Sequence, residues 1–246
     1  PKYKNTARFD PKVNVLITPQ QTGSSNKPLT YIAGIESGLL TTASFLPDMP
    51  VKFGTYEPQN AEGSEVPYVE GSQRNFLRNM LRESKNRPAI VAADMMGVDL
   101  MVQMYQKLGL SAFKTRKDVG IAAMLGAIEV KPAEHFNAFA VLANKGKYNP
   151  LQPILKILDR DGKVVWEYKP DGGKQVVDER ATYLMSDMLY NYNNNLVKGV
   201  NGYPAAGKTG TSNDNKDMYF VGYTPEVVTG IWIGNNNNAS TKRSAN

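Results

Sequence analysis

A serine and a lysine three positions apart form the pair in this chain that is best suited to nucleophilic chemistry. Ser24 and Lys27 stand in the stretch Gly-Ser-Ser-Asn-Lys-Pro at residues 23–28. On a helix, residues three apart share a face, so the hydroxyl and the amine can meet. Lysine becomes a base for serine when burial or a second cation lowers its pKa from about 10.4 toward neutrality. The pair therefore predicts an activated serine, although Ser-x-x-Lys alone also occurs at exposed helix starts.

The same stretch has the features of a helix N-terminus. Pro28 is tolerated near the first turn, because the N–H groups there have no helical partner. The N–H of Ser24 is then free to point at a developing oxyanion. We expect this helix to end near Gly38 and to bury a stripe formed by Leu29, Ile32, Ala33 and Ile35. Nucleophile, base and half of an oxyanion hole would lie within one turn.

A second lysine stands near the C-terminus, in Gly-Lys-Thr-Gly-Thr-Ser at residues 207–212. Side chains alternate along a strand, so Lys208, Gly210 and Ser212 should face one side. Thr209 and Thr211 should face the other. A bare glycine leaves room for a ligand or another backbone, and lysine and threonine side chains can bind a carboxylate. The alternative is an ordinary exposed edge strand.

Residues 202–209 also match the phosphate-loop pattern G-x-x-x-x-G-K-[ST]. A phosphate loop needs a buried strand before it and a helix after it. Here an Asn-rich loop at 191–195 comes before, and a strand pattern follows. The context therefore does not favour ATP or GTP binding.

Composition bounds the class of protein. The chain has 246 residues, 41% of them hydrophobic, which supports a real core. It has no cysteine, and its one histidine, His135, has no second ligand nearby, so we expect no metal and no cofactor and take His135 as structural or surface. The net charge of +6 favours anionic surroundings. No basic run with interleaved aromatic residues occurs, so nucleic acid is not an expected partner.

Hydrophobic periodicity predicts the elements that position these residues. We divide the chain into a lead-in at 1–22, a domain at 23–234 and a polar, unpacked tail at 235–246. The domain has a helical region at about 23–150 and 178–195 and sheet strands at about 206–234. A short strand is expected at 13–17, and a long loop at 41–71. Helices or helical segments are expected at 73–83, 89–96, 99–108, 119–129 and 132–144, and one capped by Asp178.

Two regions have the period of strands. Residues 154–158 and 163–168 flank Asp161-Gly162 and predict a hairpin. Residues 208–212, 218–223 and 227–234 alternate and predict a three-stranded antiparallel meander. No run of about 18 apolar residues occurs. Together these patterns indicate an α+β protein.

Three short motifs stand in an order that resembles the penicillin-binding and serine β-lactamase superfamily. They are Ser24-x-x-Lys27, Ser84-x-Asn86 and Lys208-Thr209-Gly210. Each alone is weak, but three in the right order and context are a strong joint signal. The resemblance covers nearly the whole chain from residue 23 onward.

The sequence between the motifs is similar to the transpeptidase domain of class A, bifunctional penicillin-binding proteins. Residues 56–60 and 68–71 resemble the stretch before the second motif, and 143–146 resemble its Ala-Asn-x-Gly signature. Residues 217–225 and 231–234 resemble the strands after the third motif. The resemblance implies a β-lactamase/transpeptidase-like α+β fold, with an antiparallel sheet flanked by a helical cluster.

The resemblance further implies a DD-transpeptidase that cross-links peptidoglycan stem peptides. Ser24 would be acylated by the D-Ala-D-Ala end of one stem peptide, and Lys27 would take its proton. Ser84 would relay a proton to the leaving amine, and Asn86 would hold Lys27 or the substrate backbone. An amine of a second stem peptide would resolve the acyl-enzyme. A β-lactam would remain on the serine, because its leaving group stays tethered.

The third motif completes the implied site. Lys208 would lend charge to the serine of the second motif and to the terminal carboxylate of the substrate. Thr209 and Thr211 would bind that carboxylate, beside the bare Gly210. Backbone N–H groups of Ser24 and Thr211 would form the oxyanion hole.

Electrostatics favours the same assignment. Two lysines that converge on one cleft repel each other, which lowers the pKa of one and lets Lys27 act as a neutral base. A third lysine, Lys85, stands within the second motif, and we expect it to face solvent.

The implied setting is the outer face of the bacterial plasma membrane, with stem peptides and β-lactams as partners. The family's glycosyltransferase domain, its membrane anchor and its C-terminal helix are not recognisable, so we expect a fragment that is incomplete at both termini. A serine β-lactamase and a β-lactam sensor are the alternatives. A β-lactamase needs a group that activates water, and spacing nominates no such acid in 41–71 or 159–178.

Overall fold

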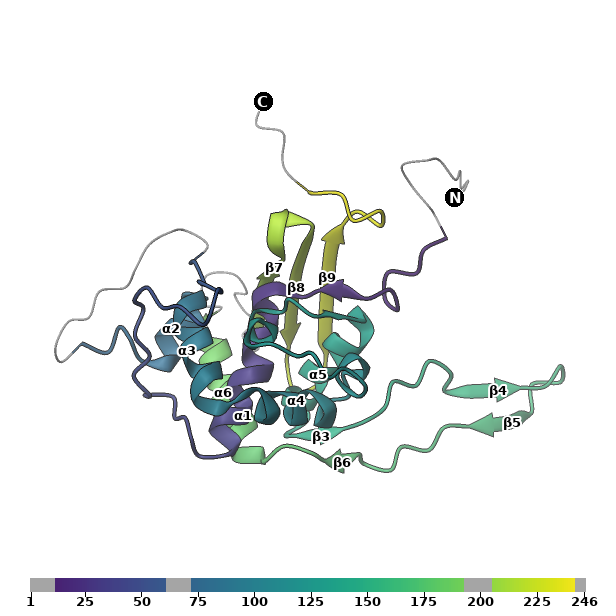
Figure 1. The fold of residues 1–246 in the computed structure, drawn as a ribbon. Coiled ribbons are helices and arrows are strands. Elements are labelled where there is room, and N and C mark those ends of the chain that lie inside the picture. Colours follow the sequence, from purple (N-terminus) through teal and green to yellow (C-terminus); the bar gives the residue numbers. More distant parts are fainter. Residues whose placement is uncertain (1–11, 61–71, 193–204, 242–246) are drawn as a thin grey trace.

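An antiparallel sheet and a group of helices lie against each other in the computed structural model (Figure 1). The structure describes residues 12–60, 72–192 and 205–241. The expected tail beyond 241, the family-like stretch at 68–71 and residues 193–195 of the Asn-rich loop lie outside the described residues. No helix in the described parts of the chain is long and apolar enough to cross a membrane.

The sheet consists of β7 (Ala206–Thr211), β8 (Asp217–Tyr223) and β9 (Val228–Gly234), in the order β7-β8-β9. Both pairings are antiparallel, with Lys208 opposite Val221 in the first. Alternate residues of β8 are buried, as expected for a strand with one face on a core. The predicted meander is confirmed, and β7 forms one edge of it.

The predicted N-terminal helix is also present. A 3-10 turn at Gly23–Asn26 leads into α1 (Lys27–Glu36), and Pro28 occupies the first turn. Helix α1 is buried along its first eight residues, since α3, α4 and α6 all contact it. Gly38 follows the helix with a positive φ of 78°, a conformation in which glycine has no Cβ to clash. The helix is thus the central rod of the helical layer (Figure 1).

The helices around α1 follow the predicted order with shifted ends. They are α2 (Leu77–Arg82), α3 (Asn86–Met96), α4 (Val98–Lys107), α5 (Pro132–Ala143) and α6 (Glu179–Tyr192). Short 3-10 turns occur at Ser111–Phe113 and Ile121–Leu125.

Three helix boundaries differ from the prediction. Helix α2 begins four residues later than expected, because Phe76 is extended and pairs with Phe45 in an isolated bridge. Helix α3 begins at Asn86, since Pro88 falls within the first turn, where a missing N–H breaks no helical bond. The segment 119–129 contains only a 3-10 turn before it enters a strand.

The prediction of a strand at 13–17 is wrong. The carbonyl of Asn14 accepts the N–H groups of Ile17 and Thr18, both at 3.2 Å, and its side chain accepts the N–H of Leu16 at 3.1 Å. These bonds close a turn, as asparagine often does. The strand lies further on, where β1 (Gln20–Gln21) pairs with β2 (Glu129–Val130).

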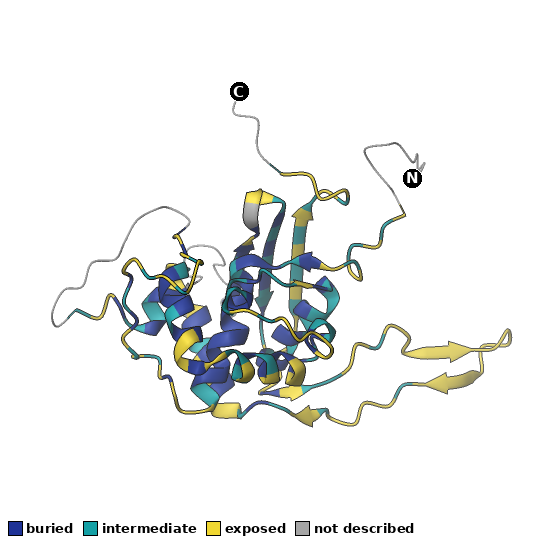
Figure 2. Cartoon of the chain, viewed as in Figure 1, coloured by how far each residue is buried: buried dark blue, intermediate teal, exposed yellow. Residues whose placement is uncertain are grey.

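The predicted hairpin is present and extends away from the rest of the molecule. It is formed by β4 (Lys156–Leu158) and β5 (Val164–Glu167), and every residue of both strands is exposed (Figure 2). At its base, β3 (Lys147–Tyr148) pairs with β6 (Lys174–Gln175).

The tail was expected to be unpacked, but its described part forms hydrogen bonds with the turn between β7 and β8. Ser240 Oγ donates to the carbonyl of Asp214 at 2.6 Å, and the N–H of Thr241 donates to the carbonyl of Asn215 at 2.8 Å.

Candidate active site

The Ser24 turn (Gly23–Asn26) lies directly against strand β7. A Cβ on Gly23 would lie 2.2 Å from the carbonyl oxygen of Thr211, and one on Gly210 would lie 2.2 Å from the carbonyl oxygen of Thr22. Neither position leaves room for a side chain. The two glycines therefore permit the close approach that brings the backbone of Ser24 and Thr211 to the same end of one cavity.

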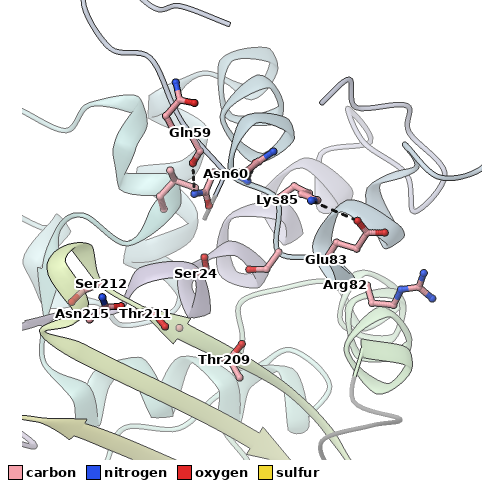
Figure 3. Close-up of a pocket in the computed structure, with 14 residues that line it drawn as sticks. Ser24, Gln59, Asn60, Arg82, Glu83, Lys85, Thr209, Thr211, Ser212 and Asn215 are labelled. Atoms are coloured by element: carbon pink, nitrogen blue, oxygen red, sulfur yellow. Dashed lines mark hydrogen bonds and ion pairs between the residues drawn. The ribbon is translucent and has the colours of Figure 1, made fainter. Parts of the chain in front are cut away.

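That cavity has a volume of about 600 Å³. Ser24 lies in its wall, between Thr209 and Thr211 of β7 on one side and Asn60 and Lys85 on the other (Figure 3). The Ser24 hydroxyl forms no hydrogen bond with any residue that the structure describes. The hydroxyl is thus open to a mostly polar cleft.

The segment between α2 and α3 brings the second motif to the opposite wall. Ser84 has a φ of 56°, which is uncommon for a residue other than glycine. Asn60 Oδ1 holds the next turn in place by accepting the N–H of Asn86 at 2.9 Å. Asp48 fixes Asn60 in turn, by accepting its amide at 2.8 Å. The loop at 41–60 therefore supports the second motif.

Lys27 points from α1 at this segment. Its ammonium donates to Asn86 Oδ1 at 2.7 Å, to the carbonyl of Ser84 at 2.5 Å and more weakly to Ser84 Oγ at 3.5 Å. The residue is fully buried.

Lys208 reaches the same serine from β7. Its ammonium donates to Ser84 Oγ at 2.9 Å and to the carbonyl of Thr209 at 3.1 Å, and it too is fully buried. As expected for strand alternation, Gly210 and Ser212 are buried on the same side, while Thr209 is half-buried and Thr211 exposed. Two lysines from distant parts of the chain thus converge on one hydroxyl.

Burial and repulsion act together on these amines. Burial is the main reason why the pKa of Lys27 lies well below its usual 10.5, and the charges of Lys208 and Lys85 lower it further. Burial also lowers the pKa of Lys208 to about 7. A neutral amine is therefore accessible near neutral pH, which is what a lysine base requires.

One residue near the site differs from the prediction. Lys85 is only 8% exposed rather than solvent-facing, and its ammonium lies 3.9 Å from Glu83 Oε2 (Figure 3). His135, predicted to be structural or surface, is completely buried, with Nε2 2.8 Å from Ser25 Oγ, and is thus a structural residue.

Several residues that line the cavity have no role predicted from the sequence. They are Gln59, Asn60, Arg82, Glu83, Leu125 and Asn215. Residues 59 and 60 belong to the stretch at 56–60 that resembles the family, so this resemblance could have indicated that they line the site. The others carry no pattern of their own.

Comparison with known proteins places these features in a family. The family model "Penicillin binding protein transpeptidase domain" matches residues 1–246. Penicillin-binding protein 1A of Neisseria meningitidis serogroup A is 31% identical over 232 residues, which are 87% of this chain and 28% of the relative. Penicillin-binding protein 1A of Clostridium botulinum is 30% identical over 242 residues, or 89% of this chain and 27% of the relative. The chain thus spans little more than a quarter of the length of these relatives.

Solved structures give the same fold. Penicillin-binding protein 1A from Haemophilus influenzae has a TM-score of 0.80 at 25% identity, over 95% of this chain and 41% of that chain. Penicillin-binding protein PonA1 from Mycobacterium tuberculosis has a TM-score of 0.82 at 20% identity, over 96% of this chain and 65% of that chain. These matches confirm the predicted β-lactamase/transpeptidase-like fold.

Proposed function

The chain belongs to the penicillin-binding protein transpeptidase domain family, and on that premise we propose that it is a DD-transpeptidase that works through an acyl-enzyme on Ser24. One observation supports this proposal most strongly. Two buried lysines, from α1 and β7, meet at Ser84 across the cavity onto which Ser24 opens. Such a cluster of amines with lowered pKa values is suited to activating a serine.

In the first step, neutral Lys27 takes the proton of Ser24 Oγ, which attacks the carbonyl of the penultimate D-alanine. The backbone N–H groups of Ser24 and Thr211 bind the resulting oxyanion. The scissile C–N bond then breaks as the leaving amine gains a proton from Ser84 Oγ. The proton on Lys27 replaces it, over the contact of 3.5 Å between the two groups. The products are free D-alanine and an ester on Ser24.

The second step reverses these proton movements. The amine of a second stem peptide attacks the ester carbonyl, loses a proton to the same relay and forms the cross-linking amide. The C–O bond breaks, and Ser24 Oγ recovers its proton. A β-lactam follows only the first step, because the amine that ring opening releases stays attached to the acyl group and blocks the approach of another amine.

The terminal carboxylate of the donor peptide is proposed to bind at Thr209 and Thr211, with the charge of Lys208 behind them. A carboxylate at this place favours the protonated form of Lys208 and raises its pKa. Protonated Lys208 in turn favours neutral Lys27. Substrate binding would therefore help to set the protonation state that acylation needs.

Mass spectrometry of the intact chain after exposure to benzylpenicillin tests this function. We expect one adduct, mapped to Ser24, and none in Ser24→Ala. Undiminished labelling of Ser24→Ala would refute the assignment of the nucleophile, and no adduct on the unmodified chain would refute the function itself.

The alternatives within the superfamily have distinct outcomes. Glu83 is the only carboxylate among the described residues that line the cavity, and it lies beside Lys85. Rapid turnover of nitrocefin would indicate a β-lactamase, whereas a long-lived adduct is expected here. Labelling without transfer from a peptide-like thioester to a D-amino acid would indicate a sensor.

We further propose that the domain acts at the outer face of the bacterial plasma membrane, within a longer, membrane-anchored protein that carries a glycosyltransferase domain. The share of the relatives that this chain spans supports only the longer parent protein in this proposal. Protease accessibility of the parent protein in spheroplasts tests it, because only an outward-facing domain is cleaved there.

A further inference from the structure

A buried histidine lies directly beneath the Ser24 turn. His135 belongs to α5 and is completely buried. Its Nε2 lies 2.8 Å from Ser25 Oγ, and the Ser25 hydroxyl donates to the carbonyl of Thr22, also at 2.8 Å. Because that hydroxyl has a single hydrogen, Nε2 is the donor in its bond with Ser25. The chain Thr22–Ser25–His135 thus consists of two directed hydrogen bonds.

These two bonds bracket the nucleophile. Thr22 and Ser25 are the residues on either side of Gly23 and Ser24, so the bond between them closes the turn around Ser24. The same atoms lie against β7, because a Cβ on Gly210 would come within 2.2 Å of the Thr22 carbonyl oxygen and 2.8 Å of Ser25 Oγ. A change in the position of Ser25 would therefore move both the turn and its contact with the strand.

The histidine ring packs against one ring of its own helix and one ring of the sheet. It meets the ring of Phe139 edge to face, with centroids 5.4 Å apart, and that of Tyr219 in β8 at 5.8 Å. Burial lowers the pKa of His135 to about 3, so the ring is neutral at physiological pH. Its Nδ1 has no hydrogen-bond partner among the described residues. A fully apolar side chain would fill this site without leaving a polar atom unpaired.

We propose that His135 is a positioning residue for acyl transfer, acting through Ser25. Its hydrogen bond fixes the Ser24 turn, so that Ser24 Oγ and the Ser24 N–H keep the alignment that attack and oxyanion binding require. Small displacements of such groups are costly because orientation contributes much of the rate. The proposal rests on the proposed function, and it assigns His135 no proton transfer.

Kinetics of acylation by benzylpenicillin separate positioning from stability. Stopped-flow measurements give the acylation rate constant k2 and the dissociation constant K of the preceding complex. His135→Leu should lower k2 by about three- to tenfold, the range expected for one buried hydrogen bond, and leave K within about twofold. Ser25→Ala also breaks the bond to Thr22, so it should lower k2 at least as much. His135→Gln should recover most of k2, because its amide nitrogen can replace Nε2 as donor.

Two controls make the result specific. The double variant, with both His135→Leu and Ser25→Ala, should have a k2 no lower than that of the slower single variant. Both changes break the bond between these two residues, so their effects should not add. Phe139→Leu removes packing against the histidine ring but leaves the bond to Ser25, so it should lower the melting temperature and not k2.

The proposal is overturned if His135→Leu lowers k2 no more than Phe139→Leu, or if the losses in the double variant add. Should His135→Leu fail to fold, Ser25→Ala still tests the proposal, because an unchanged k2 in that variant would overturn it. Absence of acylation in the unmodified chain refutes the proposed function instead.

Discussion

Replacing Lys208 by methionine should suppress acylation at neutral pH and restore it as the pH rises. The contacts of Lys27 and Lys208 with Ser84 Oγ, at 3.5 and 2.9 Å, limit the distance between the two ammonium nitrogens to about 6.4 Å. At an effective dielectric constant of about 20, two charges at that distance repel by about 2.6 kcal/mol. Removing one full charge therefore raises the pKa of Lys27 and lowers its neutral fraction by about 80-fold.

The second-order rate of acylation by a fluorescent penicillin, measured from about pH 5 to 10, gives the profile to compare. Acylation requires neutral Lys27, so the rate rises with pH through the lowered pKa of Lys27. In Lys208→Met this rise should move to higher pH. Lys208→Arg keeps a positive charge across this whole range, so the rise should not move to higher pH, even if its maximum is lower.

The outcome that refutes this reasoning is a loss of activity without a shift. If the profile of Lys208→Met rises at the same pH as that of the unmodified chain, repulsion from Lys208 does not set the state of Lys27. An equal shift in Lys208→Arg would refute it as well, because charge would then not be the cause.

Three further predictions concern single side chains. Asn86→Ala removes the acceptor 2.7 Å from Lys27 Nζ and should slow acylation by about tenfold or more, with little change in the binding of the penicillin, as measured by k2 and K. Gly210→Ala places a Cβ 2.2 Å from the Thr22 carbonyl oxygen. It should lower the free energy of unfolding, measured by chemical denaturation, by about 1–3 kcal/mol and remove most of the acylation rate. An unchanged stability and an unchanged acylation rate would contradict the close approach. Asp178→Ala removes the side chain that accepts a backbone N–H in the first turn of α6 and should lower the melting temperature at pH 7. Since the pKa of Asp178 is lowered to about 2 in the fold, its contribution is present above its unfolded pKa of about 3.9 and fades as the pH falls toward 2, where the two proteins should melt alike.

Local patterns in the sequence predicted much of the fold, because period and turn chemistry are local properties. The alternation along β8 and the Asp-Gly turn of the exposed hairpin were both sufficient to predict strands. Wrong predictions occurred where a distant segment, or the local hydrogen bonds of one asparagine, decided the conformation. Residues 73–76 have helical spacing, but Phe76 is extended by its bridge to Phe45. Asn14 has strand-like neighbours, yet its carbonyl closes a turn.

The candidate site was predictable in its motifs and not in its surroundings. Ser24, Lys27, Ser84, Asn86 and Lys208 stand in recognisable spacing, and the structure brings them to one cavity and its lysine cluster. Nothing in the sequence indicates that His135, 110 positions after Ser25, lies beneath the turn. Nor does it indicate that Lys85 is buried, because the fold of the α2–α3 connection decides its exposure. Such positions depend on how layers pack.

The arrangement around Ser84 also sets the direction in which its hydrogen can point. Both ammonium groups donate to the same oxygen, and a hydroxyl oxygen has two lone pairs. With both lone pairs occupied, the O–H bond is no longer a free rotor and is directed away from the two nitrogens. The hydroxyl is left with one proton to give and no lone pair for a third donor. A leaving amine would thus meet a donor that is oriented before it arrives.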